Sequence, residues 1–490
     1  MVTYFAAATL AALVRTAAPV LTIAAALAIS APAALADTYH PNKLGDHTPG
    51  KCNRRDCTLR EAITKANNHA GIDTIVLQGG KTYGLSLSNL AGEEDANATG
   101  DLDVVRSLTI KSSNAKLATV DANSIDRVFE IGTNSPVSAT FRRVTITDGH
   151  AQLTAHGGGI DSEYGGTLKL IKSKVVGNRT DREGGGIAAD GGTLKVIRSV
   201  IGHNSATQPA QNAGGIEGEP GATQNEVISI SRSRIVDNHA GSNGGGVYAY
   251  HRLTISRSIV RGNTAGVQGG GIYNFGKATI TRSTIADNRA TANVGGGIHN
   301  AEGRLIVRSS TLNGNVAANN DGGGIENYDT AILVNDTITR NRAGGNGGGI
   351  DADGVETRLN GVTIARNSAT GNGGGIQEEG TPFTMRNSVV ALNSTTSGLG
   401  PDCYSAVTPS AGHNLIGDTA GCAGIFGPAT NDFTNVNPRI ARLASNGGPT
   451  KTIALKRRSK AINHAGGGAP KRDQRGVKRH NPDIGAFERP

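Results

Sequence analysis

The stretch GGGIENY, residues 322–328, decides the fold of this chain. Three glycines before a branched apolar residue suit a loop that cradles phosphate, a calcium-binding repeat, or a tight turn that leads into a β-strand. Each of these structures requires a different sequence around the motif. The rest of the sequence therefore shows which of the three structures the motif forms.

The glycine motif recurs along the chain. Its nine copies end at Ile160, Ile187, Ile216, Val247, Ile272, Ile298, Ile325, Ile350 and Ile376. Successive copies are about 25 to 31 residues apart, and a fixed period of this length indicates a repeating structural unit. A phosphate loop has no reason to recur in this way. The calcium-binding β-roll repeat is only about nine residues long and keeps an acidic position after the glycines, which this sequence does not.

Asparagines mark the same period. They stand at Asn178, Asn204, Asn238, Asn263, Asn288, Asn315, Asn341, Asn367 and Asn393. Between the two markers lie segments such as 253–260, 278–285 and 304–312, which alternate apolar and polar residues and are rich in Ile, Val and Thr. This alternation predicts that each segment is a short, half-buried strand.

The repeat unit predicts an all-β chain that folds as a right-handed parallel β-helix, with three short strands per coil. Stacked coils lie about 4.8 Å apart, so an Asn at the same corner of each coil can bond to its neighbours. Glycines supply the positive φ that sharp corners need. We expect Ile272, Ile298, Ile325, Ile350 and Ile376 to form one internal column.

The N-terminal part of the chain carries two further signals. Arg15, an apolar run and the small residues Ala34 and Ala36 predict a secretory signal peptide over residues 1–36. In residues 57–71, Thr58 and Glu61 have the spacing of a capping box, which predicts a short helix that caps the coils. The first expected strand is 73–77.

The four cysteines form two local pairs, Cys52 with Cys57 and Cys403 with Cys422. An exported chain meets an oxidising compartment, which favours a disulfide within each pair. We expect no zinc site, because neither pair has C-x-x-C spacing.

The formal net charge of +9 is concentrated near the C-terminus, where Lys456, Arg457, Arg458 and Lys460 stand close together. A basic segment on an exported protein favours an anionic polysaccharide or a cell-envelope surface as partner. Nucleic acid is not expected, because aromatic residues do not interleave with these charges. No segment after the signal peptide is apolar and long enough to predict a transmembrane helix.

Residues 57–63, CTLREAI, with Cys52 upstream, resemble the Cys-Ser-Leu-Arg-Glu-Ala (CSLREA) domain of exported bacterial β-helix proteins. Segments 414–422, 443–455, 473–476 and 483–488 resemble the choice-of-anchor Q domain. The resemblance implies a secreted or cell-surface protein with a signal peptide over 1–36, an N-terminal cap over 37–77, a β-helix over 78–395 and an anchor-Q-like region over 396–490. It implies no catalytic residues. No sorting or anchoring device follows those motifs in this sequence, so we expect no covalent or barrel anchor.

One row of residues is the candidate for a functional site. The residue after each motif isoleucine should point away from the core, since side chains alternate along a strand. The row contains Asp161, Ala188, Glu217, Tyr248, Tyr273, His299, Glu326, Asp351 and Gln377. Tyr248, Tyr273 and Glu217 are the expected ligand-binding residues on this solvent-facing row. Glu326, Asp351 and His299 are the candidate catalytic residues, because two carboxylates one coil apart suit a retaining glycosidase. The same pair of carboxylates would also suit a cation site.

These observations favour a binding or structural module, with anionic polysaccharide as the preferred ligand class. The alternative is a polysaccharide lyase or glycoside hydrolase of the pectin-lyase-like fold. We expect no cofactor and no metal, and Ca²⁺ would be possible only for the enzyme. The sequence does not determine the oligomeric state.

Overall fold

The computed structural model describes residues 35–48, 50–89, 94–133, 135–153, 155–219, 226–380, 382–405, 410–423 and 426–490. Nearly all of the predicted signal peptide, residues 1–36, lies outside this range. Residues 35–490 form one compact unit, which contains every element below.

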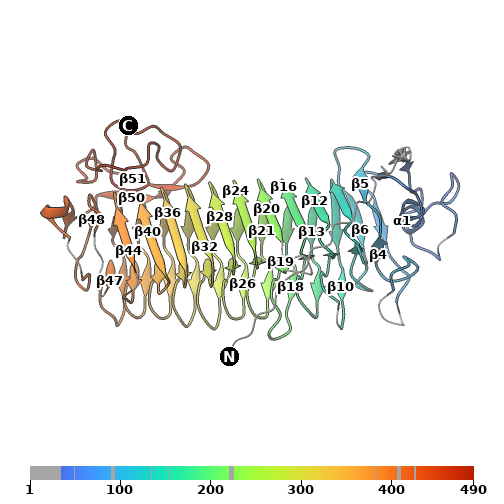
Figure 1. Ribbon diagram of the computed structural model, residues 1–490, viewed down its shortest axis with the longest axis horizontal. Helices are drawn as coiled ribbons and strands as arrows, with labels where there is room; N and C mark the ends of the chain where they lie inside the picture. The colour runs from blue at the N-terminus through green and yellow to red at the C-terminus, as the bar shows by residue number, and fades with distance from the viewer. Residues whose placement is uncertain are drawn as a thin grey trace, which may run out of the picture. The chain divides into compact units, whose positions relative to one another are not determined.

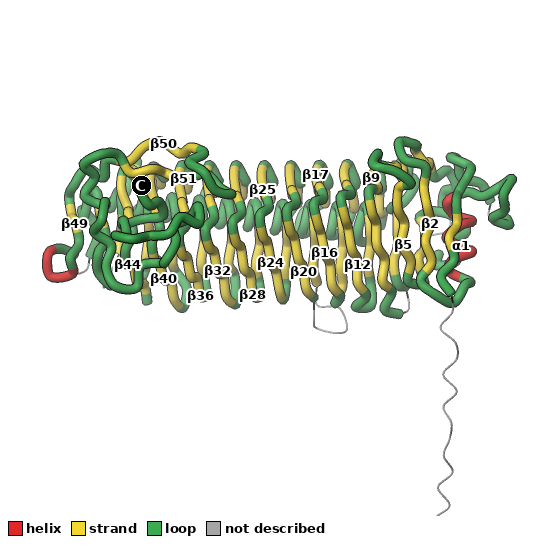
Figure 2. Tube along the Cα trace, turned by 90° about the horizontal axis from the view of Figure 1, so that it is seen from above, coloured by secondary structure: helices red, strands yellow, loops and turns green. Residues whose placement is uncertain are grey.

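The unit is a parallel β-helix, as the sequence predicts (Figures 1 and 2). Each regular coil contributes one strand to each of four parallel sheets, here sheets A, B, C and D, and it passes through them in the order A, B, D, C. Sheet C alone has twelve strands. One short α-helix and one 3₁₀ turn are the only helical elements among the described residues, so the all-β class is confirmed.

Sheets A and B contain the strands that lead into and out of one corner of each coil. Sheet A consists of β1 (Thr38–Tyr39), β2 (Asp73–Leu77), β5 (Leu108–Ser112), β8 (Ser138–Arg142), β12 (Thr167–Ile171), β16 (Thr193–Ile197), β20 (Val227–Ser231), β24 (Arg252–Ser256), β28 (Lys277–Thr281), β32 (Arg304–Arg308), β36 (Thr330–Val334), β40 (Glu356–Asn360) and β44 (Phe383–Arg386). Sheet B consists of β3 (Thr82–Gly84), β6 (Ala118–Asp121), β9 (Val144–Thr147), β13 (Lys174–Val176), β17 (Val200–Gly202), β21 (Arg234–Val236), β25 (Ile259–Arg261), β29 (Thr284–Ala286), β33 (Thr311–Asn313), β37 (Thr337–Thr339), β41 (Thr363–Ala365), β45 (Val389–Ala391), β48 (Leu415–Ile416) and β49 (Phe433–Thr434).

Sheets C and D complete each coil. Sheet C, which starts at the motif isoleucines, consists of β4 (Leu102–Val104), β7 (Phe129–Ile131), β11 (Ile160–Ser162), β15 (Ile187–Asp190), β19 (Ile216–Glu219), β23 (Val247–Ala249), β27 (Ile272–Asn274), β31 (Ile298–Asn300), β35 (Ile325–Asn327), β39 (Ile350–Ala352), β43 (Ile376–Glu378) and β47 (Cys403–Ser405). Sheet D consists of β10 (His150–Ala151), β14 (Arg179–Thr180), β18 (Ser205–Ala206), β22 (His239–Ala240), β26 (Thr264–Ala265), β30 (Arg289–Ala290), β34 (Val316–Ala317), β38 (Arg342–Ala343), β42 (Ser368–Ala369) and β46 (Ser394–Thr395).

The expected single strand over 253–260 is wrong, because the chain turns a corner inside it. Strand β24 ends at Ser256, Arg257 takes a positive φ of 49°, and β25 begins at Ile259. Each coil therefore has four strands rather than three. Three consecutive polar residues, 256–258, interrupt the apolar–polar alternation at the corner, but they include no Gly, Pro, Asn or Asp that would mark a turn in the sequence.

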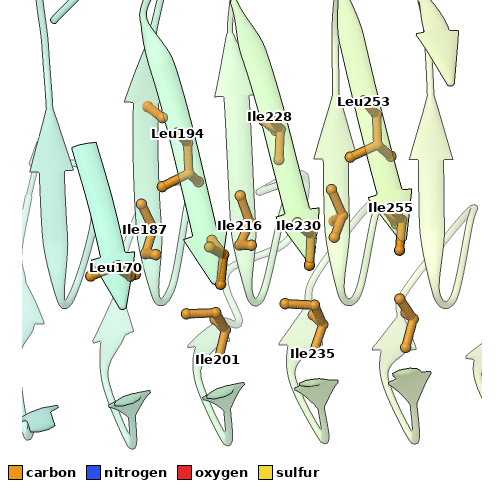
Figure 3. Close-up of a cluster of buried hydrophobic side chains, with 14 of the residues drawn as sticks. Leu170, Ile187, Leu194, Ile201, Ile216, Ile228, Ile230, Ile235, Leu253 and Ile255 are labelled. Carbon is orange, nitrogen blue, oxygen red and sulfur yellow. The ribbon is translucent and has the colours of Figure 1, made fainter. Parts of the chain in front are cut away.

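The core is a set of stacked aliphatic columns. Figure 3 shows Ile187 and Ile216 from sheet C facing Leu194 and Ile228 from sheet A across the interior. Farther along, the five isoleucines from Ile272 to Ile376 pair in register and are buried, which confirms the predicted column.

The predicted asparagine ladder is also confirmed. The backbone N–H and Nδ2 of Asn263 both donate to Oδ1 of Asn288, at 3.1 and 2.9 Å. The same pair of bonds repeats from Asn178 to Asn393, and the ladder ends on the carboxylate of Asp402. A second ladder, which the sequence analysis missed, joins buried serines at the corner between sheets A and B, as in Ser233 N–H to Ser258 Oγ at 3.1 Å.

The N-terminal end of the solenoid is capped by helix α1 (Leu59–Asn67). The side chain of Thr58 accepts from the Glu61 N–H and the Glu61 side chain accepts from the Thr58 N–H, which confirms the capping box. The first strand of the described residues is β1, which pairs with β2, so pairing begins earlier than the expected 73–77.

The C-terminal segment, residues 440–490, packs against the side of the last coils (Figures 1 and 2). It holds the antiparallel hairpin of β50 (Ile440–Ala444) and β51 (Thr452–Leu455), while a short 3₁₀ turn, η1 (Pro428–Thr430), precedes it. Nε2 of Gln474 donates to the Ser310 carbonyl at 3.0 Å, and Thr337 Oγ1 donates to Gln474 Oε1 at 2.6 Å.

Both predicted disulfides are confirmed, Cys52–Cys57 and Cys403–Cys422. Among the residues that the structure describes, no helix has the length and apolar character needed to cross a membrane.

Candidate functional site

The candidate row runs along sheet C without a break. In-register pairing makes each residue of the row the neighbour of the next one on the following coil. In chain order the row is Asp103, Glu130, Asp161, Ala188, Glu217, Tyr248, Tyr273, His299, Glu326, Asp351, Gln377 and Tyr404. The candidate residues His299, Glu326 and Asp351 are therefore neighbours on three successive strands.

The expected exposure of this row is wrong at its charged positions. Glu217 and Glu326 are 0% exposed, while His299 and Asp351 are 1% exposed. The three tyrosines of the row, Tyr248, Tyr273 and Tyr404, are half-buried. The side chains do point away from the aliphatic core, but the loop that precedes each strand covers them.

The glycine-rich loop before each strand provides this cover. In eight of the nine copies the first motif position is a glycine with a positive φ that packs on the row residue four positions later, so that a Cβ on Gly322 would overlap with the side chain of Glu326. In the copy before Glu217, Ala213 takes this position with a φ of 56°. Gly295 lies against His299 and Gly347 against Asp351 in the same way. The motif thus makes a corner and also closes a lid over the outward row, which periodicity alone does not reveal.

Aromatic side chains occupy the middle of the row. The rings of Tyr248 and Tyr273 stack with centroids 4.9 Å apart and planes 4° from parallel. The His299 ring lies 5.1 Å from Tyr273 and contacts Tyr328 edge-on, also at 5.1 Å. Tyr328 is 43% exposed, so this aromatic block reaches solvent at its margin.

Acidic residues lie on the C-terminal side of the aromatic block. Carboxylate oxygens of Glu326, Asp351 and Asp353 all lie within 4.8 Å of one another. Burial raises the pKa of Glu326 well above its ordinary value, and the negative charge of Asp351 raises it further. Burial likewise raises the pKa of Asp351, with Asp353 as the next cause.

A second acidic group lies on the N-terminal side of the aromatic block, where Glu217 lies near Glu183 and His156. Nδ1 of His156 is 3.9 Å from Glu217 Oε2, and Asn212 donates to Glu183 at 2.9 Å. Burial raises the pKa of Glu217 well above its ordinary value, with Glu183 as the next cause.

Arg127 neutralises the acids at the N-terminal end of the row. Its guanidinium forms ion pairs with Asp101 and Glu130 and lies 3.4 Å from Asp161. Arg127, Glu130 and Asp161 line a cavity of about 230 Å³ together with His156. Because the cation and the acids are paired and buried, the group reads as a structural network.

The geometry limits what the candidate catalytic residues can do. Burial lowers the pKa of His299 to about 3, so its imidazole is neutral at neutral pH and cannot serve as a general acid there. Glu326 and Asp351 lie under the glycine loops and make no surface that a polymer could contact in this conformation. Their catalytic role stays a prediction that no observation supports.

An exposed row of cations lies elsewhere, at the corner between sheets A and B, and the sequence analysis missed it. We call it the cation ladder, and it comprises Arg143, Lys172, Arg198, Arg232, Arg257 and Arg282. Each of the six has a positive φ between 49° and 56°. The Lys172 N–H donates to the Ile197 carbonyl of the next coil, and equivalent bonds stack all six corners.

The ladder side chains are available for a ligand. Five are exposed and Arg143 is partly exposed, and none has an ion-pair partner among the described residues. The signal that could have found them is an Arg or Lys followed by Ser once per coil, as at 198–199 and 232–233. Their separation in sequence hides the pattern until the register is known.

The ladder stops where the C-terminal segment begins to cover the corner. The next corner residues are Ser309 and Asn335, and they contact the segment instead of solvent. Oγ1 of Thr450 donates to the Ser309 carbonyl at 3.2 Å, and Asn335 Nδ2 donates to the Arg472 carbonyl at 2.7 Å. Cations are thus present at the uncovered corners and absent from the covered ones.

The predicted basic segment of the C-terminus is exposed as well. Lys456, Arg457, Arg458 and Lys460 lie in the turn that follows β51, and all four side chains face solvent.

Comparisons with known proteins add little to this geometry. No family model matches the chain, and no curated protein matches it. Among solved structures, the chain is similar to the one described as the crystal structure of pectate lyase Pel9A, with 14% identity, a TM-score of 0.33, and coverage of 93% of this chain and 96% of that one. A likeness this distant does not bear on function, and the β-helix assignment rests on the strand pairing itself.

Proposed function

We propose that this protein is a binding module for anionic polysaccharide and that the cation ladder is its contact surface. The observation that carries the proposal is the presence of one unpaired cation per coil over six successive coils. A structural role would require partners for these charges, and the described residues offer none as ion pairs.

The spacing of the ladder suits a linear polyanion. Coils stack about 4.8 Å apart, so six cations span about 24 Å along the solenoid. Charges on neighbouring coils, about 4.8 Å apart at the backbone, lie within the screening length of about 10 Å at 0.1 M salt and therefore attract a polyanion jointly. Guanidinium groups also bind carboxylates and sulfates through paired hydrogen bonds, which favours the arginines that make up most of the ladder.

The basic turn at Lys456, Arg457, Arg458 and Lys460, which follows β51 in the C-terminal segment, is a second contact in this proposal. A polysaccharide that reached both surfaces would bind more tightly, because binding at one surface raises the effective concentration of the polymer at the other. Neutralising each surface separately measures how much each contributes.

We also propose that the protein is an exported bacterial β-helix protein of the cell surface or its surroundings, with CSLREA-like and choice-of-anchor-Q-like ends. The two disulfides support an oxidising compartment. The predicted signal peptide supports export. Mass spectrometry of the mature protein from its native host would show whether the chain begins at Asp37.

The test of the contact surface is retention on immobilised polyuronate as a function of salt. The variant carries Arg232→Gln, Arg257→Gln and Arg282→Gln, which remove three adjacent ladder charges. We expect the wild type to be retained at low salt and to elute as salt rises, and the variant to elute at lower salt by a clear margin.

A matched control carries Arg179→Gln, Arg289→Gln and Arg342→Gln. These three cations are also exposed, and the net charge changes equally. They lie on coils of sheet D that are not adjacent, so they do not form a continuous row. Equal losses in both triple variants would show that net charge alone drives retention, which would contradict the proposal. Equal retention on duplex DNA would contradict the ligand class.

A lyase or hydrolase is the second candidate function, and its catalytic residues would be Glu326 and Asp351. Incubation with a panel of anionic glycans, scored for unsaturated and reducing ends, tests it directly. Turnover that disappears in the Glu326→Gln and Asp351→Asn double variant would favour the enzyme over the binding module.

A further inference from the structure

The acidic group at Glu326, Asp351 and Asp353 has unused ligand atoms. Both carboxylate oxygens of Glu326, Oδ1 of Asp351 and Oδ1 of Asp353 are buried and have no hydrogen-bond partner among the described residues. These three side chains offer oxygen atoms that lie within 4.8 Å of one another. Buried carboxylate oxygens without partners are costly, and they are rare in stable folds.

The surroundings do not supply a compensating charge. The charges that act most strongly on Glu326 belong to Asp351, Asp353, Asp321 and Glu379, and all are negative. The Glu217 group differs in this respect, because His156 lies 3.9 Å from it. The acidic group at the N-terminal end of the row has Arg127 as its cation. The group at Glu326 is therefore the one of the three acidic groups on this row for which no neighbouring cation is found among the described residues.

The position of the group leaves a route for an ion. Asp353 is partly exposed at the end of strand β39, while Glu326 and Asp351 lie beneath the glycine loops. Asp321 lies in one of these loops, and one of its oxygens accepts from the Asn346 N–H. A cation could enter past the partly exposed Asp353 and be bound on its buried side by Glu326 and Asp351.

We propose that Glu326, Asp351 and Asp353 bind a calcium ion, with Glu326 as a ligand from beneath the loop. The ligand atoms are all oxygens, and four of them come from three carboxylates, which favours a hard cation over zinc or copper. Calcium tolerates the irregular arrangement of side chains from two coils, whereas magnesium demands a near-octahedral one. Water and loop carbonyls would complete its coordination.

The site ties together two coils and the loop that covers them. Calcium bound there would bridge β35 to β39 and hold in place the glycine loop of residues 318–324, which connects β34 to β35. This proposal does not depend on polysaccharide binding, because the cation ladder lies at a different corner of the coils.

The test is calorimetric and thermal titration of the whole chain with calcium chloride after treatment with EDTA. We expect saturable binding and a rise of several degrees in the unfolding midpoint. Glu326→Gln should weaken binding by more than about tenfold and abolish the thermal shift. Asp353→Asn, at a partly exposed position that should not disturb folding, should weaken binding as well.

The matched control is Glu217→Gln, which removes a buried carboxylate from the same row in the other acidic group. It should leave calcium binding unchanged. The proposal is overturned if the wild type shows no calcium-dependent shift, if Asp353→Asn binds as tightly as the wild type, or if Glu217→Gln abolishes binding. An equal shift with magnesium at the same concentration would overturn the assignment to calcium.

Terbium luminescence gives a readout that a purely structural role would not change. Terbium shares the ligand preference of calcium and emits when a nearby tyrosine absorbs. Tyr328 stands two residues after Glu326, and its ring lies 5.1 Å from that of His299, the row neighbour of Glu326. The chain has no Trp to confuse the signal. We expect calcium to displace terbium emission, and Tyr328→Phe to dim the emission while the calcium affinity stays unchanged. Emission as bright in Glu326→Gln as in the wild type would place the ion elsewhere.

Discussion

Gly322 shows how one backbone position sets the environment of a side chain four residues later. Its φ of +67° turns the loop back over strand β35, and its missing Cβ leaves the space that the carboxylate of Glu326 fills. The same relation holds for Gly295 with His299 and for Gly347 with Asp351. The glycines therefore determine which row residues lose water, and with it their ordinary pKa values.

Glu226 gives a test of burial at a single residue. Its side chain is buried, and burial raises its pKa to about 7, while the His251 N–H donates to Oε2 at 2.9 Å. The folded protein therefore holds this proton more tightly than the unfolded chain does. The stabilisation that Glu226 contributes is therefore complete at low pH, and it is lost as the pH rises from the ordinary glutamate pKa through about 7.

Glu226→Gln removes this titration. We expect the stability of the wild type relative to the variant to fall by about 2 to 3 kcal/mol from about pH 5 to about pH 8. Denaturant unfolding at each pH measures the difference. Glu302→Gln, at an exposed position, controls for the change of charge. A difference that rises with pH would show that Glu226 is stabilised as an anion.

Ladders are the unit of stabilisation at the scale of the coil. Asn315 is buried and donates from Nδ2 to the Ile285 carbonyl at 3.0 Å and to Asn341 Oδ1 at 2.9 Å. It also accepts two bonds from Asn288. One side chain thus satisfies polar groups in three coils, which explains why the residue recurs once per repeat.

Asn315→Ala should therefore cost more than an ordinary polar deletion. It leaves the Ile285 carbonyl and the Asn288 amide without partners, and each unsatisfied buried group costs about 1 to 3 kcal/mol. We expect a loss of about 2 to 5 kcal/mol in the free energy of unfolding, measured by denaturation. Asn319→Ala, an exposed Asn in the next turn, should change it by less than about 0.5 kcal/mol. Equal losses in the two variants would contradict the ladder account.

The elements differ in how far the sequence could predict them. Ile325 and Asn315 recur at a fixed period, so the column and the ladder follow from repetition and stacking. The corner at Arg257 does not, because the polar residues 256–258 that form it include no Gly, Pro, Asn or Asp to mark a turn. The burial of Glu326 could not be predicted either, since the loop that covers it is polar and glycine-rich, like a solvent-exposed turn.

The cation ladder needed a register that the sequence supplies only in part. Arg232 and Arg257 are distant in sequence, and each is unremarkable as a turn residue. Only the pairing of sheets A and B, as in Arg234 with Ile259, places their corners on adjacent coils. The basic turn at Lys456 was found because its cations are consecutive. Sequence reasoning therefore detects charge that is clustered along the chain and misses charge that is clustered by stacking.

At the scale of the whole solenoid, the C-terminal segment covers one flank of the last coils. Gln474 is its central contact, with Nε2 bonded to the carbonyls of Ser310 and Lys451 and to the hydroxyls of Thr311 and Thr450. A solenoid is stabilised by contacts between adjacent coils, so the loss of a flanking segment should stay local.

Gln474→Ala should therefore loosen the C-terminal segment without disturbing the distant coils. It leaves the Thr337 hydroxyl and several buried acceptors without their partner, and local opening then requires less free energy. Hydrogen exchange measured by mass spectrometry should show faster exchange over residues 440–490 and at the corners of Ser309 and Asn335. Exchange in the coils of residues 226–300 should be unchanged. Lys478→Ala, at an exposed position in the same segment, is the control and should alter neither region. Faster exchange throughout the solenoid would mean that the segment stabilises all coils cooperatively, and the view of this protein as a stack of locally stabilised layers would have to be abandoned.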